Sequence, residues 1–156
     1  MNNVIYRFAN KEEIQDLTEL SSVIYKKPVS FEYFKWFYDY FDNISNSVAV
    51  AETDNKLVAL QPFTLLSLKT PDGERKVAFL TGVGTHPNYR RRGIFSSLIE
   101  FTTNALYNRG DIEFIYTFPN EFSFPGFLKL IGWQLFGELN LYVKPLNLFS
   151  TVKGFI

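Results

Sequence analysis

The chain has 156 residues, close to the usual size of one domain and enough to bury a hydrophobic core. Hydrophobic residues make up 46% and charged residues 21%, which is ordinary globular usage and argues against wholesale disorder. No apolar run approaches the length needed to span a membrane. The formal net charge is zero, so the chain lacks the basic excess that general nucleic-acid binding requires.

Residue counts also bear on compartment, metals and surface. The chain has no cysteine, which excludes disulfides and thiolate chemistry, and its only histidine is His86, which argues against a histidine-based metal site. Because the start carries no cleavable signal pattern, we expect a cytoplasmic protein. From the apolar runs, the net charge and the cysteine and histidine counts, we expect that it binds neither membrane nor nucleic acid and holds no metal. Phenylalanine occurs 17 times, so we expect some aromatic side chains to line a pocket or a partner surface.

One strand and two helices open the chain. Residues 4–8 alternate between apolar and partly polar side chains, which predicts a strand. Asn10 and Glu13 form a capping-box-like pattern at the start of a first helix. Ser30 is the expected cap of a second helix over 31–41. The buried stripe expected for the first helix consists of Ile14, Leu17, Leu20 and Ile24.

The second helix is unusually aromatic and has two interpretations. Core packing accounts for Phe31, Phe34 and most of their neighbours, and we favour it. The functional interpretation assigns Tyr33, Trp36 and Tyr40 to the wall of a substrate pocket.

Three strands joined by short turns are predicted next. They cover residues 48–52, 57–68 and 77–85, and the turns contain Asn, Asp, Pro and Gly at residues 54–56 and 71–73. Such short connections predict an antiparallel meander.

A basic turn follows the third strand. Arg90, Arg91 and Arg92 stand immediately before Gly93, and a helix with apolar residues at helical spacing starts at Ile94. Gly110, which can take the left-handed conformation, is the expected stop of this helix. The first amides of a helix have no internal partner and carry partial positive charge, so such a start attracts phosphate. Glycine lets the backbone approach an anion closely. We interpret this turn as a pyrophosphate site, with a solvated basic helix start as the alternative.

A strand, a short helix and a last strand complete the order of elements. The strand over 112–118 follows a helix, so it should pair in parallel with the strand over 77–85. Asn120 is the expected cap of a short helix over 121–131, and 134–143 is the expected last strand.

The basic turn and its surroundings carry a resemblance. The stretch VGTHPNYRRRGIFSSLIEF, residues 83–101, resembles the acyl-CoA-binding motif of the GNAT superfamily of N-acetyltransferases, whose signature is Arg/Gln-x-x-Gly-x-Gly/Ala. Arg90 and Gly93 match this signature, and Phe95 stands at the place of its final small residue. The order of predicted elements resembles that of the family across nearly all of the chain. The resemblance implies an α+β acyltransferase fold: a central, mostly antiparallel sheet with a splayed parallel strand pair, flanked by about four helices.

The resemblance also implies acetyl-CoA, or another acyl-CoA, as co-substrate. The strands over 77–85 and 112–118 would splay apart and leave amides free to hold the pantetheine arm. Gly82 and Gly84 fit a strand that bulges or admits a ligand, although simple sheet irregularity explains them equally well. The residues implied to contact the arm are Val83, Gly84, Thr85, Asn120 and Ser123. The residues implied to bind the pyrophosphate are Arg90, Arg91, Arg92, Gly93, Ile94, Phe95 and Ser96.

Catalytic residues are less clearly marked. The family often uses a tyrosine on the helix after the second splayed strand as the acid, and an alignment from Asn120 places Phe127 there. Tyr116 is the substitute candidate, with a structural tyrosine or catalysis by water as alternatives. Glu121 is the carboxylate closest to the expected site and is the candidate base. His86 is better explained by a capping or solvated role in its Thr-His-Pro turn.

Three hypotheses follow. The first is an acyl-CoA-dependent N-acyltransferase that moves an acetyl group to a primary amine of a small molecule or peptide. The second is a non-catalytic acyl-CoA-binding or partner-binding domain of the same fold. The third is one half of a larger two-domain protein: residues 1–145 would form the acyltransferase domain, and residues 146–156 would begin a further segment. A homodimer or a second domain is compatible with each.

Overall fold

The computed structural model describes residues 3–40 and 48–139, except for the side chains of residues 37–40. Short 3-10 turns at Lys11–Glu13 and Pro87–Tyr89 precede the first and third helices. The helices and strands, in chain order, are β1 (Ile5–Phe8), α1 (Ile14–Tyr25), α2 (Phe31–Tyr40), β2 (Val48–Thr53), β3 (Lys56–Thr70), β4 (Gly73–Leu80), β5 (Gly84–Thr85), α3 (Ile94–Tyr107), β6 (Phe114–Thr117) and α4 (Phe124–Phe127).

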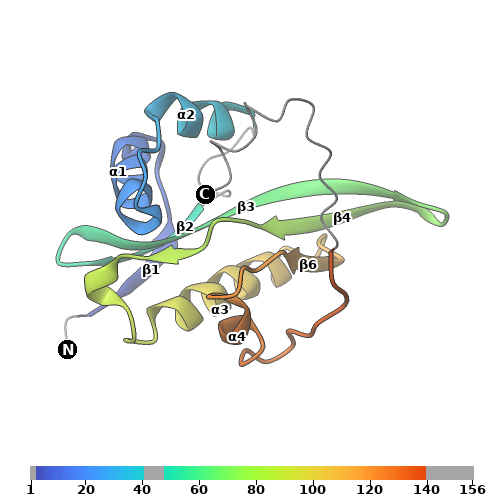
Figure 1. Ribbon diagram of the computed structural model, residues 1–156. Coiled ribbons are helices and arrows are strands. Elements are labelled where there is room, and N and C mark those ends of the chain that lie inside the picture. Colours follow the sequence, from blue (N-terminus) through green and yellow to red (C-terminus); the bar gives the residue numbers. More distant parts are fainter. Residues whose placement is uncertain (1–2, 41–47, 140–156) are drawn as a thin grey trace, which may run out of the picture.

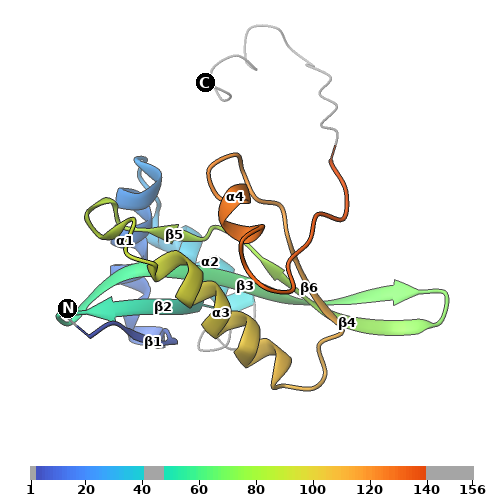
Figure 2. The ribbon, with the colours of Figure 1, turned by 90° about the horizontal axis from the view of Figure 1, so that it is seen from below.

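Within the described ranges, six strands form one sheet in the order β1-β2-β3-β4-β6, with β5 paired to β3. Strands β2, β3 and β4 form an antiparallel meander, as their short turns predict. Strand β6 lies parallel to β4 at the edge of the sheet (Figure 2). The expected α+β fold, a mostly antiparallel sheet with one parallel pair, is confirmed.

Helices cover both faces of the sheet. Figure 1 shows α1 and α2 on one face and α3 and α4 on the other. Strand β3 runs through the middle, and its side chains alternate between the two layers. Leu60 packs with Leu17 and Ile24 of α1, whereas the neighbouring Ala59 packs with Leu98 of α3. The middle of β3 is therefore buried on both sides.

The predicted helix ends are confirmed at three positions. The Glu13 carboxylate accepts a hydrogen bond of 2.6 Å from the Asn10 amide, as a capping box requires. The Ser30 hydroxyl accepts a hydrogen bond of 3.0 Å from the Tyr33 amide and caps α2. After α3, Gly110 takes the left-handed conformation with φ of 73°.

Three predicted elements are shorter than expected. The strand over 77–85 is interrupted after Leu80, because three residues bulge out before β5 begins. The helix over 121–131 is reduced to α4, because the Asn120 side chain folds the next residues into a turn. The strand over 112–118 is observed as Phe114–Thr117.

The predicted last strand is wrong over the residues that can be checked. Residues 134–139 form no strand, and their apolar side chains, such as that of Phe136, are exposed. A strand needs a neighbour for its backbone groups, and this run pairs with no described strand. Residues 140–143 and the tail over 146–156 lie outside the described ranges. None of the described helices has the length and apolar character needed to cross a bilayer.

Candidate functional site

The site is organised around a bulge between β4 and β5. Leu80 pairs with Phe63, and Gly84 pairs with Leu60, so three residues on one strand face two on β3. Gly82 lies at the centre of the bulge with φ of 51°, a conformation that favours glycine. The expectation that this strand bulges is confirmed.

A buried glutamine on β3 holds the bulge. The Gln61 side chain is fully buried, and its Nε2 donates to the carbonyl oxygens of Pro62 at 2.7 Å and Thr81 at 3.0 Å. The Thr81 amide also donates to Pro62, at 3.0 Å. Sequence reasoning missed Gln61, although a polar residue within a long apolar strand was a usable signal.

The backbone after the bulge presents amides away from β3. Pairing of β4 with β6 ends at Leu80 and Thr117, and the chain continues along β3 instead. The His86 amide donates to the Val58 carbonyl at 2.8 Å. His86 lies two residues after Gly84, so the backbone groups of both residues face β3. Because alternate residues of a strand point their backbone groups to opposite sides, the amides of Val83 and Thr85 face outward.

Gly84 itself has a packing role that the sequence did not reveal. A Cβ atom at Gly84 would lie 2.4 Å from Cγ2 of Ile24, so only glycine lets α1 pack this closely on β5. Simple sheet irregularity is therefore not the reason for this glycine.

The start of α3 forms a cluster of unpaired amides. Gly93, with φ of 79°, precedes the helix, and its carbonyl accepts the first bond, from Ser97 at 3.1 Å. Over the described part of the chain, the amides of residues 91–96 have no acceptor. Unpaired amides at a helix start are donors for an anion.

The three arginines before Gly93 differ in their contacts. Arg90 Nε donates to the Thr85 carbonyl at 3.0 Å and ties the turn to β5. Arg92 donates to the Asn88 carbonyl at 2.9 Å and lies 5.1 Å from the centre of the Tyr89 ring. Arg91 is exposed, and its side chain contacts no partner among the described residues. Of the three, Arg91 has the cation most available to a ligand.

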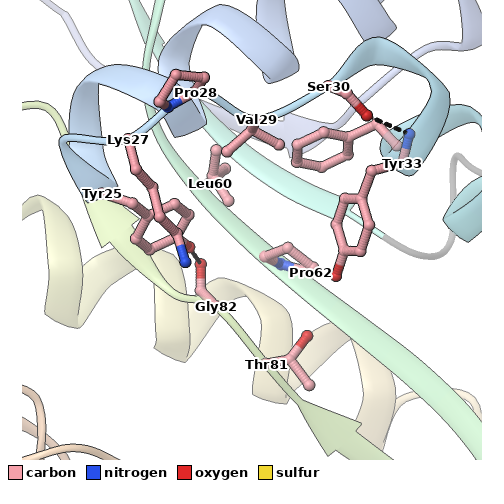
Figure 3. Close-up of a pocket in the computed structure, with 11 residues that line it drawn as sticks. Tyr25, Lys27, Pro28, Val29, Ser30, Tyr33, Leu60, Pro62, Thr81 and Gly82 are labelled. Atoms are coloured by element: carbon pink, nitrogen blue, oxygen red, sulfur yellow. Dashed lines mark hydrogen bonds between the residues drawn. The ribbon is translucent and has the colours of Figure 1, made fainter. Parts of the chain in front are cut away.

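A pocket of about 570 Å³ opens beside the bulge, on the α1–α2 face of the sheet (Figure 3). The loop between α1 and α2 forms one wall, and Pro62, Thr81 and Gly82 form the other. Tyr33, a predicted substrate-pocket residue, lines this pocket, and its contact with a substrate stays a prediction. Trp36 is not among the described residues that line it, and the side chain of Tyr40 lies outside the described residues.

Tyr25 links the pocket to the bulge. Its hydroxyl donates a hydrogen bond to the Gly82 carbonyl, which Figure 3 shows at the edge of the pocket. Burial raises the pKa of Tyr25 to about 12, and the nearby Tyr33 adds to the shift. The phenol is therefore protonated at neutral pH. Sequence reasoning missed Tyr25 because it lies 57 positions from its partner.

Comparison with known proteins agrees with this geometry. Residues 5–136 match the family model described as an acetyltransferase (GNAT) domain. The chain belongs to the GNAT acetyltransferase family. Comparison with curated protein sequences gives no match.

Solved structures of similar fold include several GNAT enzymes. The aminoglycoside N-acetyltransferase AAC(6')-Iy in complex with CoA is 15% identical, with a TM-score of 0.71 over 92% of this chain and 96% of that one. Glucosamine-6-phosphate N-acetyltransferase from Arabidopsis thaliana is 11% identical, with a TM-score of 0.69 over 91% and 99%. A transcriptional regulator from Bacillus halodurans C-125 is 17% identical, with a TM-score of 0.72 over 90% and 100%. At these identities the likeness concerns the fold.

Phe95, which departs from the GNAT signature, packs against a glycine on α4. The Phe95 ring packs edge-on against Phe127 at 5.5 Å between centroids. A Cβ atom at Gly126 would lie 2.7 Å from Phe95, so the absence of a side chain at Gly126 makes room for the ring. Phe127 is 3% exposed and belongs to the core, where it also packs on Trp133.

The candidate catalytic residues lie outside the pocket wall. Tyr116 stacks on Phe79 with 4.9 Å between ring centroids. Glu121 is exposed in the turn before α4. His86 caps the turn before α3, where its Nδ1 accepts from the Asn88 amide at 3.2 Å, as the Thr-His-Pro pattern predicts. The roles of Tyr116 and Glu121 stay predictions.

Asn120 and Ser123, predicted to contact the pantetheine arm, contact one another. Asn120 Oδ1 accepts from the Ser123 amide at 3.0 Å and from the Ser123 hydroxyl at 3.1 Å. The Asn120 side-chain carbonyl therefore shapes the turn before α4, whereas the N-cap position of α4, expected at Asn120, is occupied by Ser123. Its amide group has no acceptor among the described residues and can still donate to a ligand.

Proposed function

We propose that the protein is an acyl-CoA-dependent N-acyltransferase that transfers an acetyl group from acetyl-CoA to a primary amine. The observation that carries this proposal is the continuity between the pocket and the start of α3. Gly82 lines the pocket, and three residues later the Thr85 carbonyl holds Arg90, just before the unpaired amides. A ligand with an anionic end and a long polar arm fits this path.

The proposed binding mode uses groups of matching chemistry. The amides of residues 91–96 and the Arg91 guanidinium would bind the pyrophosphate, because both are donors to phosphate oxygens. The outward amides of Val83 and Thr85 would bind the pantetheine arm, with Asn120 as a further donor. The thioester would then lie near the bulge, beside the pocket that holds the amine.

The reaction requires three events at the thioester. The neutral amine forms a bond to the carbonyl carbon, the carbon–sulfur bond breaks, and the amine loses a proton while the thiolate gains one. Positioning of the two reactants supplies much of the rate. Tyr116, Glu121 and water are the candidates for the proton transfers.

Tyr25 is better suited to positioning than to proton transfer. A thiol ordinarily has a pKa of about 8.5, whereas that of Tyr25 is raised to about 12. Transfer of a proton from this phenol to a thiolate is therefore unfavourable. We assign Tyr25 the role of fixing the bulge through Gly82.

A second candidate function is a non-catalytic acyl-CoA-binding or partner-binding domain of the same fold. Phe127 favours this second function, because a phenylalanine side chain, here buried in the core, has no proton to give. Residues 1–145 would form the domain in either case, in a cytoplasmic setting, alone, as a homodimer or beside a second domain.

Incubation with acetyl-CoA and a panel of primary amines distinguishes the two functions. Free thiol is followed by its reaction with a chromogenic disulfide, and the amine product is weighed by mass spectrometry. Thiol release together with an acetylated amine supports the transferase. Binding of acetyl-CoA without transfer to any amine supports the second candidate. Absence of binding contradicts both.

A further inference from the structure

The pocket has an unusual balance of charge for one that receives an amine. Of the described residues that line it, Lys27 is the only charged one, and none is a carboxylate. The others are apolar or carry hydroxyl groups, such as Ser30 and Thr81. A site selective for cationic amines needs negative charge, and this wall offers the opposite.

Lys27 is available to a ligand. Its side chain is exposed, and it forms no ion pair with any described residue. Figure 3 shows it pointing from the α1–α2 loop into the pocket, toward Tyr25 and Gly82. As the only cation among the described residues of this wall, Lys27 is the group to which an anionic part of a ligand would be drawn.

We propose that the acceptor is a primary amine whose molecule also carries a carboxylate, and that Lys27 binds this carboxylate. The inference rests on the transferase function proposed above and narrows its substrate class.

The remaining wall suits an apolar or aromatic body. Val29, Phe34, Leu60 and the ring of Tyr33 line the pocket beside Lys27. Its volume of about 570 Å³ lies within the range of small-molecule sites. A carboxylated aromatic or aliphatic amine fills such a pocket with its charge at Lys27.

Two other acceptor classes fit less well. A polycationic amine, such as an aminoglycoside, would bring several ammonium groups to a wall whose described residues include no carboxylate. An amine with a phosphate dianion is better matched by arginines, and none lines the described pocket. Both classes are included in the test.

The test compares matched pairs of amines that differ in the carboxylate. Phenylalanine is paired with phenethylamine, and 4-(aminomethyl)benzoate with benzylamine; glucosamine-6-phosphate with glucosamine, and an aminoglycoside, complete the panel. Each is assayed by thiol release from acetyl-CoA with wild type, Lys27→Gln and Lys26→Gln. Lys26 is the control, because it is the adjacent lysine and does not line the pocket. The intrinsic reactivity of each amine cancels when one pair is compared across variants.

We expect the carboxylated member of a pair to have the higher kcat/KM through a lower KM. Lys27→Gln should reduce this preference by about tenfold, as expected for loss of a hydrogen bond to a charged group. Lys26→Gln should leave the preference as in wild type. Equal or better use of the amines that lack a carboxylate, of glucosamine-6-phosphate or of the aminoglycoside contradicts the inference. Such a result leaves the transferase function standing.

A binding measurement covers the case in which no amine is acetylated. The same carboxylated amines are titrated by calorimetry into the protein saturated with CoA. Binding that Lys27→Gln weakens about tenfold, with Lys26→Gln as wild type, supports the carboxylate site while the transferase proposal fails. Absence of binding, or an affinity that Lys27→Gln leaves unchanged, overturns the inference.

Discussion

The hydroxyl of Tyr25 donates a hydrogen bond to the carbonyl oxygen of Gly82 and so joins the last residue of α1 to the centre of the bulge. A Cβ atom at Gly82 would lie 2.9 Å from this hydroxyl oxygen. The helix and the bulge therefore fix one another at the wall of the pocket. The contact makes the shape of the proposed acceptor site depend on α1.

Replacement of Tyr25 by phenylalanine should alter the pH dependence of stability. The pKa of Tyr25 is raised to about 12 in the folded chain, against an ordinary value of about 10. Its stabilising contribution is therefore complete below about pH 10 and is lost as the pH rises toward about 12. Urea unfolding at pH 8 should show Tyr25→Phe less stable by about 1 kcal/mol. Across the alkaline window the two curves should converge, and parallel curves would contradict the assignment.

A methyl group at Gly84 should disrupt the packing of α1. The new Cβ would meet Cγ2 of Ile24 at 2.4 Å, so Gly84→Ala should destabilise the fold by about 2 kcal/mol. In an Ile24→Ala background the same change should cost clearly less, because the clashing atom is gone. Gly137→Ala is the control, since a Cβ atom there meets nothing within 4 Å. Additive effects of the two alanines would show that Gly84 is needed for another reason.

The ion pairs of Arg7 should matter more than an exposed pair. Arg7 bonds Glu13 at 2.5 Å and Glu52 at 2.6 Å, and all three side chains are partly buried. Arg7→Gln should destabilise the protein by about 2 kcal/mol, because it leaves carboxylates without their partner. Arg75→Gln removes a pair with Glu113 that is exposed on both sides, and should cost less than about 1 kcal/mol. Chemical unfolding compares the two variants, and equal losses would rule out a special role for Arg7.

The same cluster gives an acid-dependent signature. The hydrogen bond from Arg7 lowers the pKa of Glu13, and the Asn10 amide acts in the same direction, although burial opposes both. A lowered pKa means that the stabilisation is present above the ordinary glutamate pKa of about 4.3 and is lost as the pH falls. Arg7→Gln should therefore lose less stability than wild type between about pH 5 and about pH 3. An unchanged acid profile would show that Glu13 gains nothing from Arg7.

Much of the fold could be predicted because its signals are local. Capping by Asn10 and Ser30, the stop at Gly110 and the basic turn before Gly93 each depend on residues a few positions apart. The meander followed from short turns in the same way. Such patterns can be recognised in the sequence because the physical cause and the sequence signal lie in one segment.

The pocket could not be predicted, because it is assembled from distant segments. Tyr25 and Lys27 meet the bulge only after α1 packs on the sheet, and Gln61 acts through Thr81, which lies 20 positions away. The error over 134–139 has a related cause, since apolar content alone predicts a strand whose pairing partner is a property of the whole fold. Tyr33 lines the pocket because its helix follows directly on the loop that forms one wall, and its role toward a substrate stays a prediction.

The most direct test of the account is calorimetric titration of acetyl-CoA into wild type, Arg91→Glu and Lys69→Glu. Arg91 is chosen because Arg90 and Arg92 also hold the turn together, whereas Lys69→Glu makes the same change of charge on the exposed end of β3. We predict that wild type binds, that Arg91→Glu binds at least about tenfold more weakly because an anion now faces the pyrophosphate, and that Lys69→Glu binds as wild type. No binding by wild type, or equal affinity of all three proteins, would contradict an acyl-CoA site at the start of α3.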